Sequence, residues 1–283
     1  MVKIKKLIEK AKSANVEAQN NLGNCYFYGD SVKQDYKEAF KWYQLAAEQN
    51  YASAQCNLGL CYEFAYGVEQ NYEKAVFWYK KAAEQENITA QCNLGYCYFY
   101  GNGIERDYKK AVYWYTKAAK QGDATTQCNL GDCYYCGDGV EQDFEKAVNW
   151  FRKSAEQNYA KAQNNLGDCY YCGDGVEQDY KEAFKWFKKA AEQNYAPAQC
   201  NLGDCYYYGD GVEQNYEKAV FWFKKAAEQN FGYAQELLGN CYLLGSGVPQ
   251  DNEKAKMWHD KAKENGCEFD EELLQKMKKA FNP

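Results

Sequence analysis

A Leu-Gly pair recurs at a fixed spacing along this chain, and that spacing limits the fold more than any other feature. Consecutive copies stand 36 residues apart (58 − 22 = 36), at Leu22-Gly23, Leu58-Gly59, Leu94-Gly95, Leu130-Gly131, Leu166-Gly167, Leu202-Gly203 and Leu238-Gly239. All 7 tryptophans keep the same spacing, from Trp42 to Trp258. A strict period of this length is typical of a solenoid, in which each repeat packs against its neighbours. We therefore expect one elongated domain.

Each repeat is predicted to hold two helices joined by a glycine-rich turn. Gly137-Asp138-Gly139 shows the commonest form of the turn, and an Asp or Asn such as Asp143 follows it as a helix N-cap. A glycine inside a helix costs about 1 kcal/mol relative to alanine. Gly23 and its copies therefore indicate a close helix–helix contact. The Trp column is interpreted as an inter-repeat core rather than a binding ladder, because all copies are identical.

These patterns predict three parts. Residues 1–15 form an N-terminal capping helix, with Ile4, Leu7 and Ile8 at helical spacing. Residues 16–264 hold seven 36-residue helix-turn-helix repeats, and residues 265–283 form a C-terminal capping helix. The predicted fold class is an all-α solenoid.

Net charge and hydrophobicity argue against two classes of partner, nucleic acid and membrane. The net charge is −6, which disfavours a nucleic-acid partner because phosphate binding needs Lys/Arg-rich surfaces. No apolar run approaches the ~18–20 residues of a membrane helix, and the N-terminal segment lacks the apolar stretch of a signal peptide. We expect a cytoplasmic protein that binds neither nucleic acid nor membrane.

The 14 cysteines are expected to be free thiols used as small hydrophobic side chains. Seven stand in one column at the period of the repeat, from Cys25 to Cys241. Helices packed roughly 8–10 Å apart hold equivalent residues too far apart for a disulfide. Cys133-x2-Cys136 and Cys169-x2-Cys172 have the spacing of zinc ligands. Because Cys133 and Cys169 belong to the column, we interpret this spacing as a by-product and predict no metal.

Residues with catalytic chemistry are scarce. The chain has a single histidine, His259, beside Trp258, with no evident nucleophile or carboxylate partner, so we interpret it as a surface or packing residue. No Walker loop, Rossmann glycine pattern or zinc-protease helix is present. The sequence predicts a non-enzymatic protein without a cofactor.

The arrangement Ala-x3-Leu-Gly-x2-Tyr-x2-Gly-x-Gly-Val, followed by Lys-Ala-x2-Trp and Ala-Ala, resembles the Sel-1-like repeat, a relative of the tetratricopeptide repeat. It is matched over about residues 16–264. The resemblance implies paired antiparallel helices in a right-handed superhelix whose concave side binds proteins or peptides. A secreted cysteine-rich branch with disulfides within each repeat is linked to penicillin binding, but this chain has pairs such as Ala46-Ala47 where that branch places a cysteine.

Variable residues on the first helices are the candidate partner-binding surface. Asn129, Asp132 and Cys136 share one helix face at i, i+3 and i+7. Along the repeats this face changes from apolar and aromatic to acidic. The predicted groove residues are Asn57, Leu60, Phe64, Asn93, Tyr96, Tyr100, Asn129, Asp132, Asn165, Asp168, Asn201, Asp204 and Tyr208. The alternative is that these polar side chains are ordinary solvated surface.

We therefore predict a scaffold or adaptor that binds a protein or peptide with an apolar and a basic segment. The asparagine column is expected to hold the peptide backbone through its side-chain amides. Two alternatives are a bacterial immunity or chaperone protein for a toxin or effector, and a hydrolase resembling the cysteine-rich branch. The protein is expected to be a monomer, with self-association through the caps as the alternative.

Overall fold

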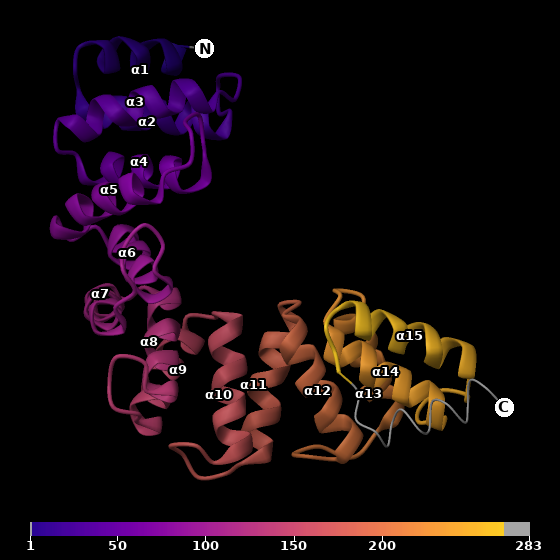
Figure 1. The fold of residues 1–283 in the computed structure, drawn as a ribbon. Helices are drawn as coiled ribbons and strands as arrows, with labels where there is room; N and C mark the ends of the chain where they lie inside the picture. Colours follow the sequence, from indigo (N-terminus) through magenta and orange to yellow (C-terminus); the bar gives the residue numbers. More distant parts are fainter. Residues whose placement is uncertain (1, 269–283) are drawn as a thin grey trace. The chain divides into compact units, whose positions relative to one another are not determined.

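A computed structural model describes residues 2–268 of the chain, and within these residues it contains fifteen α-helices and no strand (Figure 1). The helices are α1 (Val2–Lys12), α2 (Val16–Tyr28), α3 (Tyr36–Glu48), α4 (Ala52–Phe64), α5 (Tyr72–Glu84), α6 (Ile88–Tyr100), α7 (Tyr108–Lys120), α8 (Ala124–Cys136), α9 (Phe144–Glu156), α10 (Ala160–Cys172), α11 (Tyr180–Glu192), α12 (Ala196–Tyr208), α13 (Tyr216–Ala227), α14 (Gly232–Leu244) and α15 (Asn252–Glu264). The predicted all-α repeat fold is confirmed.

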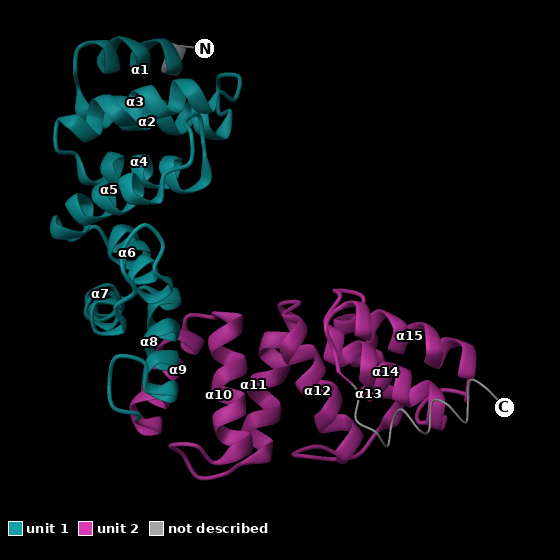
Figure 2. Ribbon diagram, viewed as in Figure 1, with its two compact units in different colours: residues 1–142 teal, residues 143–283 magenta. Residues whose placement is uncertain are grey.

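The helices fall into two compact units, which we describe separately (Figure 2). Unit 1 is Met1–Gln142 and contains α1 to α8, and unit 2 is Asp143–Pro283 and contains α9 to α15. Within each unit every helix packs against the next one in the chain. The single elongated domain and the right-handed superhelix stay predictions. No described helix has the length and hydrophobicity needed to span a bilayer.

In six of the repeats, the glycine within the first helix lies against an aromatic ring of the second helix. A Cβ atom at Gly95 would stand 2.5 Å from the Tyr115 ring, and one at Gly203 would stand 2.5 Å from the Phe223 ring. Such distances are far shorter than carbon–carbon contact. The predicted close helix–helix contact is confirmed at these six glycines, each of which packs on the ring of its own repeat.

The glycine-rich turn uses each of its glycines for a different purpose. Gly209 ends α12 with a φ of 83°, the left-handed conformation that glycine adopts without strain. Gly211 lies against the preceding repeat, where a Cβ atom would stand 2.1 Å from the carbonyl oxygen of Tyr180. The side chain of Asn215 then accepts a hydrogen bond from the Lys218 N–H and caps α13, as predicted. The turn therefore sets the spacing between neighbouring repeats.

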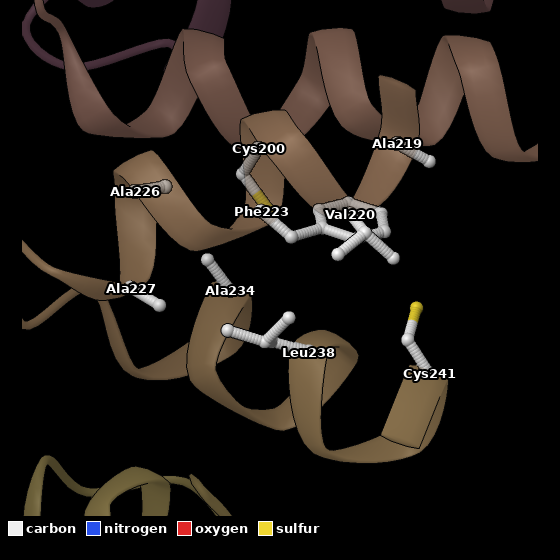
Figure 3. Close-up of a cluster of buried hydrophobic side chains, with 9 residues drawn as sticks. All are labelled: Cys200, Ala219, Val220, Phe223, Ala226, Ala227, Ala234, Leu238 and Cys241. Carbon is white, nitrogen blue, oxygen red and sulfur yellow. The ribbon is translucent and has the colours of Figure 1, made fainter. Parts of the chain in front are cut away.

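The core between repeats consists of small side chains and one large ring. In unit 2 it contains Cys200, Ala219, Val220, Phe223, Ala226, Ala227, Ala234, Leu238 and Cys241 (Figure 3). The Trp258 ring of the following repeat packs against this cluster, as Trp222 does against the one before it. The interpretation of the Trp column as inter-repeat core is confirmed. The Lys189 ammonium lies over the Trp186 ring, 3.9 Å from its centroid.

A column of buried glutamines links consecutive repeats. The amide nitrogen of Gln199, 1% exposed, donates to the Ala191 carbonyl at 3.3 Å. Its side-chain oxygen accepts from Gln229, 30 residues further along the chain, at 2.8 Å. The same pairing joins Gln49 to Gln19, Gln85 to Gln55, Gln121 to Gln91, Gln193 to Gln163 and Asn265 to Gln235. Each buried amide is thereby satisfied, which burial requires.

The sequence predicts a capping helix at each end of the repeats. Helix α1 packs against α2, with Ile4, Leu7 and Ile8 half-buried around Ala11 and Leu22. Its role as a cap stays a prediction. The predicted C-terminal capping helix, 265–283, lies mostly outside the described residues.

Candidate functional site

A cavity of about 260 Å³ lies on the first-helix surface of unit 2. Helices α10 and α12 supply its two carboxyl groups, Asp168 and Asp204, at equivalent positions of neighbouring repeats. The full lining is Asp168, Tyr171, Phe187, Asn201, Asp204, Tyr208 and Tyr233. Four of these residues were predicted from the sequence, namely Asp168, Asn201, Asp204 and Tyr208. We call this space the unit 2 cavity.

Asp168 is half-buried and held by two asparagines. Its Oδ2 accepts a hydrogen bond from Asn164 at 2.8 Å, and its Oδ1 accepts one from Asn201 of the next repeat at 3.0 Å. Burial nevertheless raises the pKa of the Asp168 carboxyl to about 7, because the two neutral amides compensate only part of the lost hydration. The group is therefore not an ordinary solvated carboxylate.

Asp204 has fewer partners than Asp168. Among the described residues, no hydrogen bond to its carboxylate is present, and no lysine or arginine acts on it. Burial, followed by repulsion from Asp210, raises the pKa of Asp204 to about 7. Two carboxyl groups without a compensating cation thus share one small space.

The aromatic ring beneath the glycine explains why neither carboxylate receives a hydrogen bond from a ring hydroxyl. In the first repeat this ring is Tyr43, whose hydroxyl donates to Asn24 Oδ1 at 2.8 Å. Asn24 occupies the column of Asp168 and Asp204. Phe187 and Phe223 take the ring position in unit 2, and a phenyl ring has no hydroxyl to donate.

The equivalent surface of unit 1 is apolar and aromatic. Leu60 is half-buried on α4, and Phe64 ends that helix with half of its surface exposed. On α6 the rings of Tyr96 and Tyr100 lie one turn apart with their centroids 4.4 Å from each other. Exposed rings this close together offer a flat apolar contact for a partner.

The asparagine column joins successive first helices. The amide nitrogen of Asn57 donates to Asn20 Oδ1 at 3.0 Å, and that of Asn201 donates to Asn164 Oδ1 at 3.1 Å. On α6, the side-chain nitrogen Nδ2 of Asn93 is buried without a hydrogen-bond partner among the described residues. These amide donors are thus partly used inside the fold, and their role toward a peptide backbone stays a prediction.

The remaining predicted residues belong to different units. Asn129 and Asp132 are half-buried on α8 of unit 1, whereas Asn165 is half-buried on α10 of unit 2. The sequence analysis missed Tyr171, Phe187 and Tyr233. Tyr233 carried a signal, because the same position of the other six repeats holds no aromatic residue.

His259 is a packing residue, and the alternative of a surface position is wrong. It takes the ring position beneath Gly239, is 0% exposed, and has its Nε2 2.9 Å from Asn240 Oδ1. Burial lowers the pKa of the imidazole to about 4, so the ring is neutral at pH 7.

The cysteine column packs in the core. Cys61, Cys97, Cys133, Cys169, Cys205 and Cys241 are buried, and all fourteen cysteines are free thiols in the structure. Cys136 and Cys172, the second members of the Cys-x2-Cys pairs, are exposed. Within the part of the chain that the structure describes, no group of three or more His, Cys, Asp or Glu side chains has the arrangement of a metal site.

The chain resembles proteins of one repeat family in sequence and in structure. The Sel1 repeat model matches residues 16–51, 52–87, 88–123, 124–159, 160–195, 196–231 and 232–267. A Sel1 repeat protein from Oxalobacter formigenes is 37% identical, with a TM-score of 0.77 over 97% of this chain and 80% of that one. A protective antigen present in uropathogenic Escherichia coli strains, which displays an SLR fold, is 34% identical, with a TM-score of 0.74 over 98% of this chain and 70% of that one. No curated protein matches significantly.

Proposed function

Because the chain belongs to the Sel1 repeat family, whose members generally mediate protein–protein interaction, we propose that it is a non-enzymatic scaffold that binds one partner protein through its first-helix surfaces. Leu60, Phe64, Tyr96 and Tyr100 of unit 1 contact an apolar segment of the partner. The unit 2 cavity contacts a basic segment. The proposed location is the cytoplasm, and the protein acts as a monomer.

The observation that carries this proposal is a pair of half-buried carboxyl groups, Asp168 and Asp204, that no lysine or arginine of the described residues compensates. Burying a charged group is unfavourable unless an opposite charge or hydrogen bonds compensate it. Burial raises the pKa of Asp168 and Asp204 to about 7, and no lysine or arginine among residues 2–268 acts on either carboxyl group. A cationic segment of a partner supplies the missing charge. The same binding ionises both carboxyl groups fully, which couples affinity to pH.

The test is quantitative capture of partner proteins from the source cells by three purified variants. Asp168→Asn with Asp204→Asn removes both charges of the cavity, and Leu60→Ser with Tyr96→Ser changes the apolar surface. Glu177→Gln with Glu213→Gln is the matched control, because both glutamates are exposed and the charge change is equal. We expect one partner that wild type and the control retain and both surface variants lose. Capture that neither surface variant alters contradicts the proposal.

A further inference from the structure

One position in the repeat array places a carboxylate in the same cavity as two tyrosines. Asp204 lies on α12, Tyr208 follows one turn later, and Tyr233 comes from α14 of the next repeat. The corresponding pair is Cys172 and Pro197 for Asp168. For Asp132 it is Cys136 and Lys161. Since the repeats share one scaffold, these differences make the Asp204 position chemically distinct.

Both tyrosines line the unit 2 cavity and remain accessible. Tyr208 is 62% exposed and Tyr233 is 48% exposed. The proximity of Asp204 contributes to the raised pKa of both phenols, although burial is the larger cause. A group that enters between the helices therefore meets ring surface and negative charge together, which is the combination that attracts an organic cation.

The oxygens of the two carboxylates differ in what they offer a ligand. Each oxygen of Asp168 already accepts an asparagine N–H. Both oxygens of Asp204 are open, since no described residue donates to them. Two open oxygens of one carboxylate match the two parallel N–H groups of a guanidinium, whereas an ammonium is a point charge without such a fork.

Size also limits the ligand. The cavity of about 260 Å³ is smaller than the roughly 300–1,000 Å³ of pockets for drug-sized molecules. It suits one long side chain that enters end on. A planar guanidinium stacks on tyrosine rings as well as pairing with the carboxylate, which favours arginine over lysine.

We propose that the unit 2 cavity binds the guanidinium group of an arginine side chain of the partner, with Asp204 as its bidentate acceptor and Tyr208 and Tyr233 as its ring contacts. This inference rests on the proposed function, because it names the chemistry of the basic segment. Asp168 adds a second negative charge, held in place by Asn164 and Asn201.

The test is an NMR titration of the full-length, isotope-labelled protein with N-acetyl-arginine amide at pH 8, where both carboxyl groups are ionised. We expect saturable shifts of cavity residues with a dissociation constant of about 1–10 mM. The lysine amide should bind at least about threefold more weakly, and the uncharged citrulline amide should not bind. Equal or tighter binding of the lysine or citrulline compound overturns the proposal, as does the absence of binding by the arginine compound.

Substitutions, some of which copy the residue at the same position of another repeat, test the role of Asp204 and Tyr233 in binding. Asp204→Asn should weaken binding more than about tenfold, and Tyr233→Thr, the residue of two earlier repeats, about two- to fivefold. Tyr233→Lys copies Lys161 and should abolish binding through a competing ammonium. Glu213→Gln is the control and should bind like wild type. Circular dichroism verifies folding of each variant, and unchanged binding by a folded Asp204→Asn protein overturns the assignment.

The two proposals fail in different ways. If partner capture still depends on Asp168 and Asp204 but N-acetyl-arginine amide does not bind, the arginine assignment is wrong and the scaffold function stands. If the arginine compound binds at Asp204 but no partner depends on the first-helix surfaces, the proposed function falls.

Discussion

Units 1 and 2 share one scaffold and differ in the ring beneath the glycines. In unit 1 the ring is a tyrosine whose hydroxyl is used inside the fold, as Tyr43 donates to Asn24 and Tyr79 donates to Glu63. In unit 2 Phe187 and Phe223 replace it beneath Gly167 and Gly203, and His259 takes the position beneath Gly239. The loss of the ring hydroxyl beneath Gly203 coincides with a carboxyl group, Asp204, whose two oxygens stay open to a ligand. A change in the core can therefore set the chemistry of the surface above it.

The largest expected effect is a loss of folding stability when the glycine within a first helix is replaced. It should be equal in the two units, because both share this contact. Gly95→Ala and Gly203→Ala each force a methyl group against a ring, and we expect each to lower the free energy of unfolding by about 3 kcal/mol. Urea denaturation followed by circular dichroism measures this change. Glu217→Ala, exposed on α13, is the control and should change stability by less than about 0.5 kcal/mol. A marked difference between the two glycine variants would break the comparison of the units.

The second effect belongs to unit 2 alone and depends on pH. Burial raises the pKa of Asp168 and Asp204 to about 7, above the roughly 4 of an unfolded aspartate. Their protonation therefore favours the folded state below about pH 4, and this contribution is lost as the pH rises through about 7. Asp168→Asn with Asp204→Asn should stabilise the protein by about 2 kcal/mol at pH 8 and change little at pH 4.

Denaturation of wild type and the double variant at both pH values checks this prediction. The difference between the two proteins removes the contribution of His259, which both contain. Stabilisation of the same size at pH 4 and pH 8 would show that the effect does not come from carboxyl ionisation.

A smaller effect is expected when the ring beneath the glycine is changed from the phenylalanine of one unit to the tyrosine of the other, or the reverse. Phe223→Tyr places a hydroxyl where Tyr43 has one, so it should donate to Asp204, lower the pKa of that carboxyl and add about 1 kcal/mol at pH 8. Tyr43→Phe removes the donor of Asn24 and should cost about 1 kcal/mol. Chemical denaturation measures both. If Phe223→Tyr destabilises the protein at pH 8, the ring column does not control the carboxylate.

The fold was predictable from the sequence because it depends on features that every repeat shares. The 36-residue period, the helical glycine and the Trp column each carry one physical requirement, and the structure meets all three. The glutamine column was equally regular, from Gln19 to Gln235, but its meaning was missed. A glutamine at the same place in all seven first helices is a sign of a buried hydrogen bond.

The candidate site was only partly predictable, because it depends on what differs between repeats. The variable face of the first helices identified Asp168, Asn201, Asp204 and Tyr208. Tyr233 comes from a neighbouring repeat, and Phe187 lies on a second helix beneath the surface. The half-burial of the two carboxyl groups follows from the packing of side chains of α10, α11, α12 and α14, which periodicity alone does not describe. A comparison of the ring positions, Phe187 and Phe223, with the carboxylate positions, Asp168 and Asp204, would have indicated that these carboxylates have no ring hydroxyl as a donor.

The ionisation of Asp168 and Asp204 tests the account most directly. Carboxyl carbon shifts of the ¹³C-labelled protein, followed from pH 3 to pH 9, give the pKa of each group. The account predicts that both titrate near pH 7, well above the roughly 4 of an unfolded aspartate. If both titrate near pH 4, the two carboxylates are ordinary solvated surface and the unit 2 cavity is not the binding site.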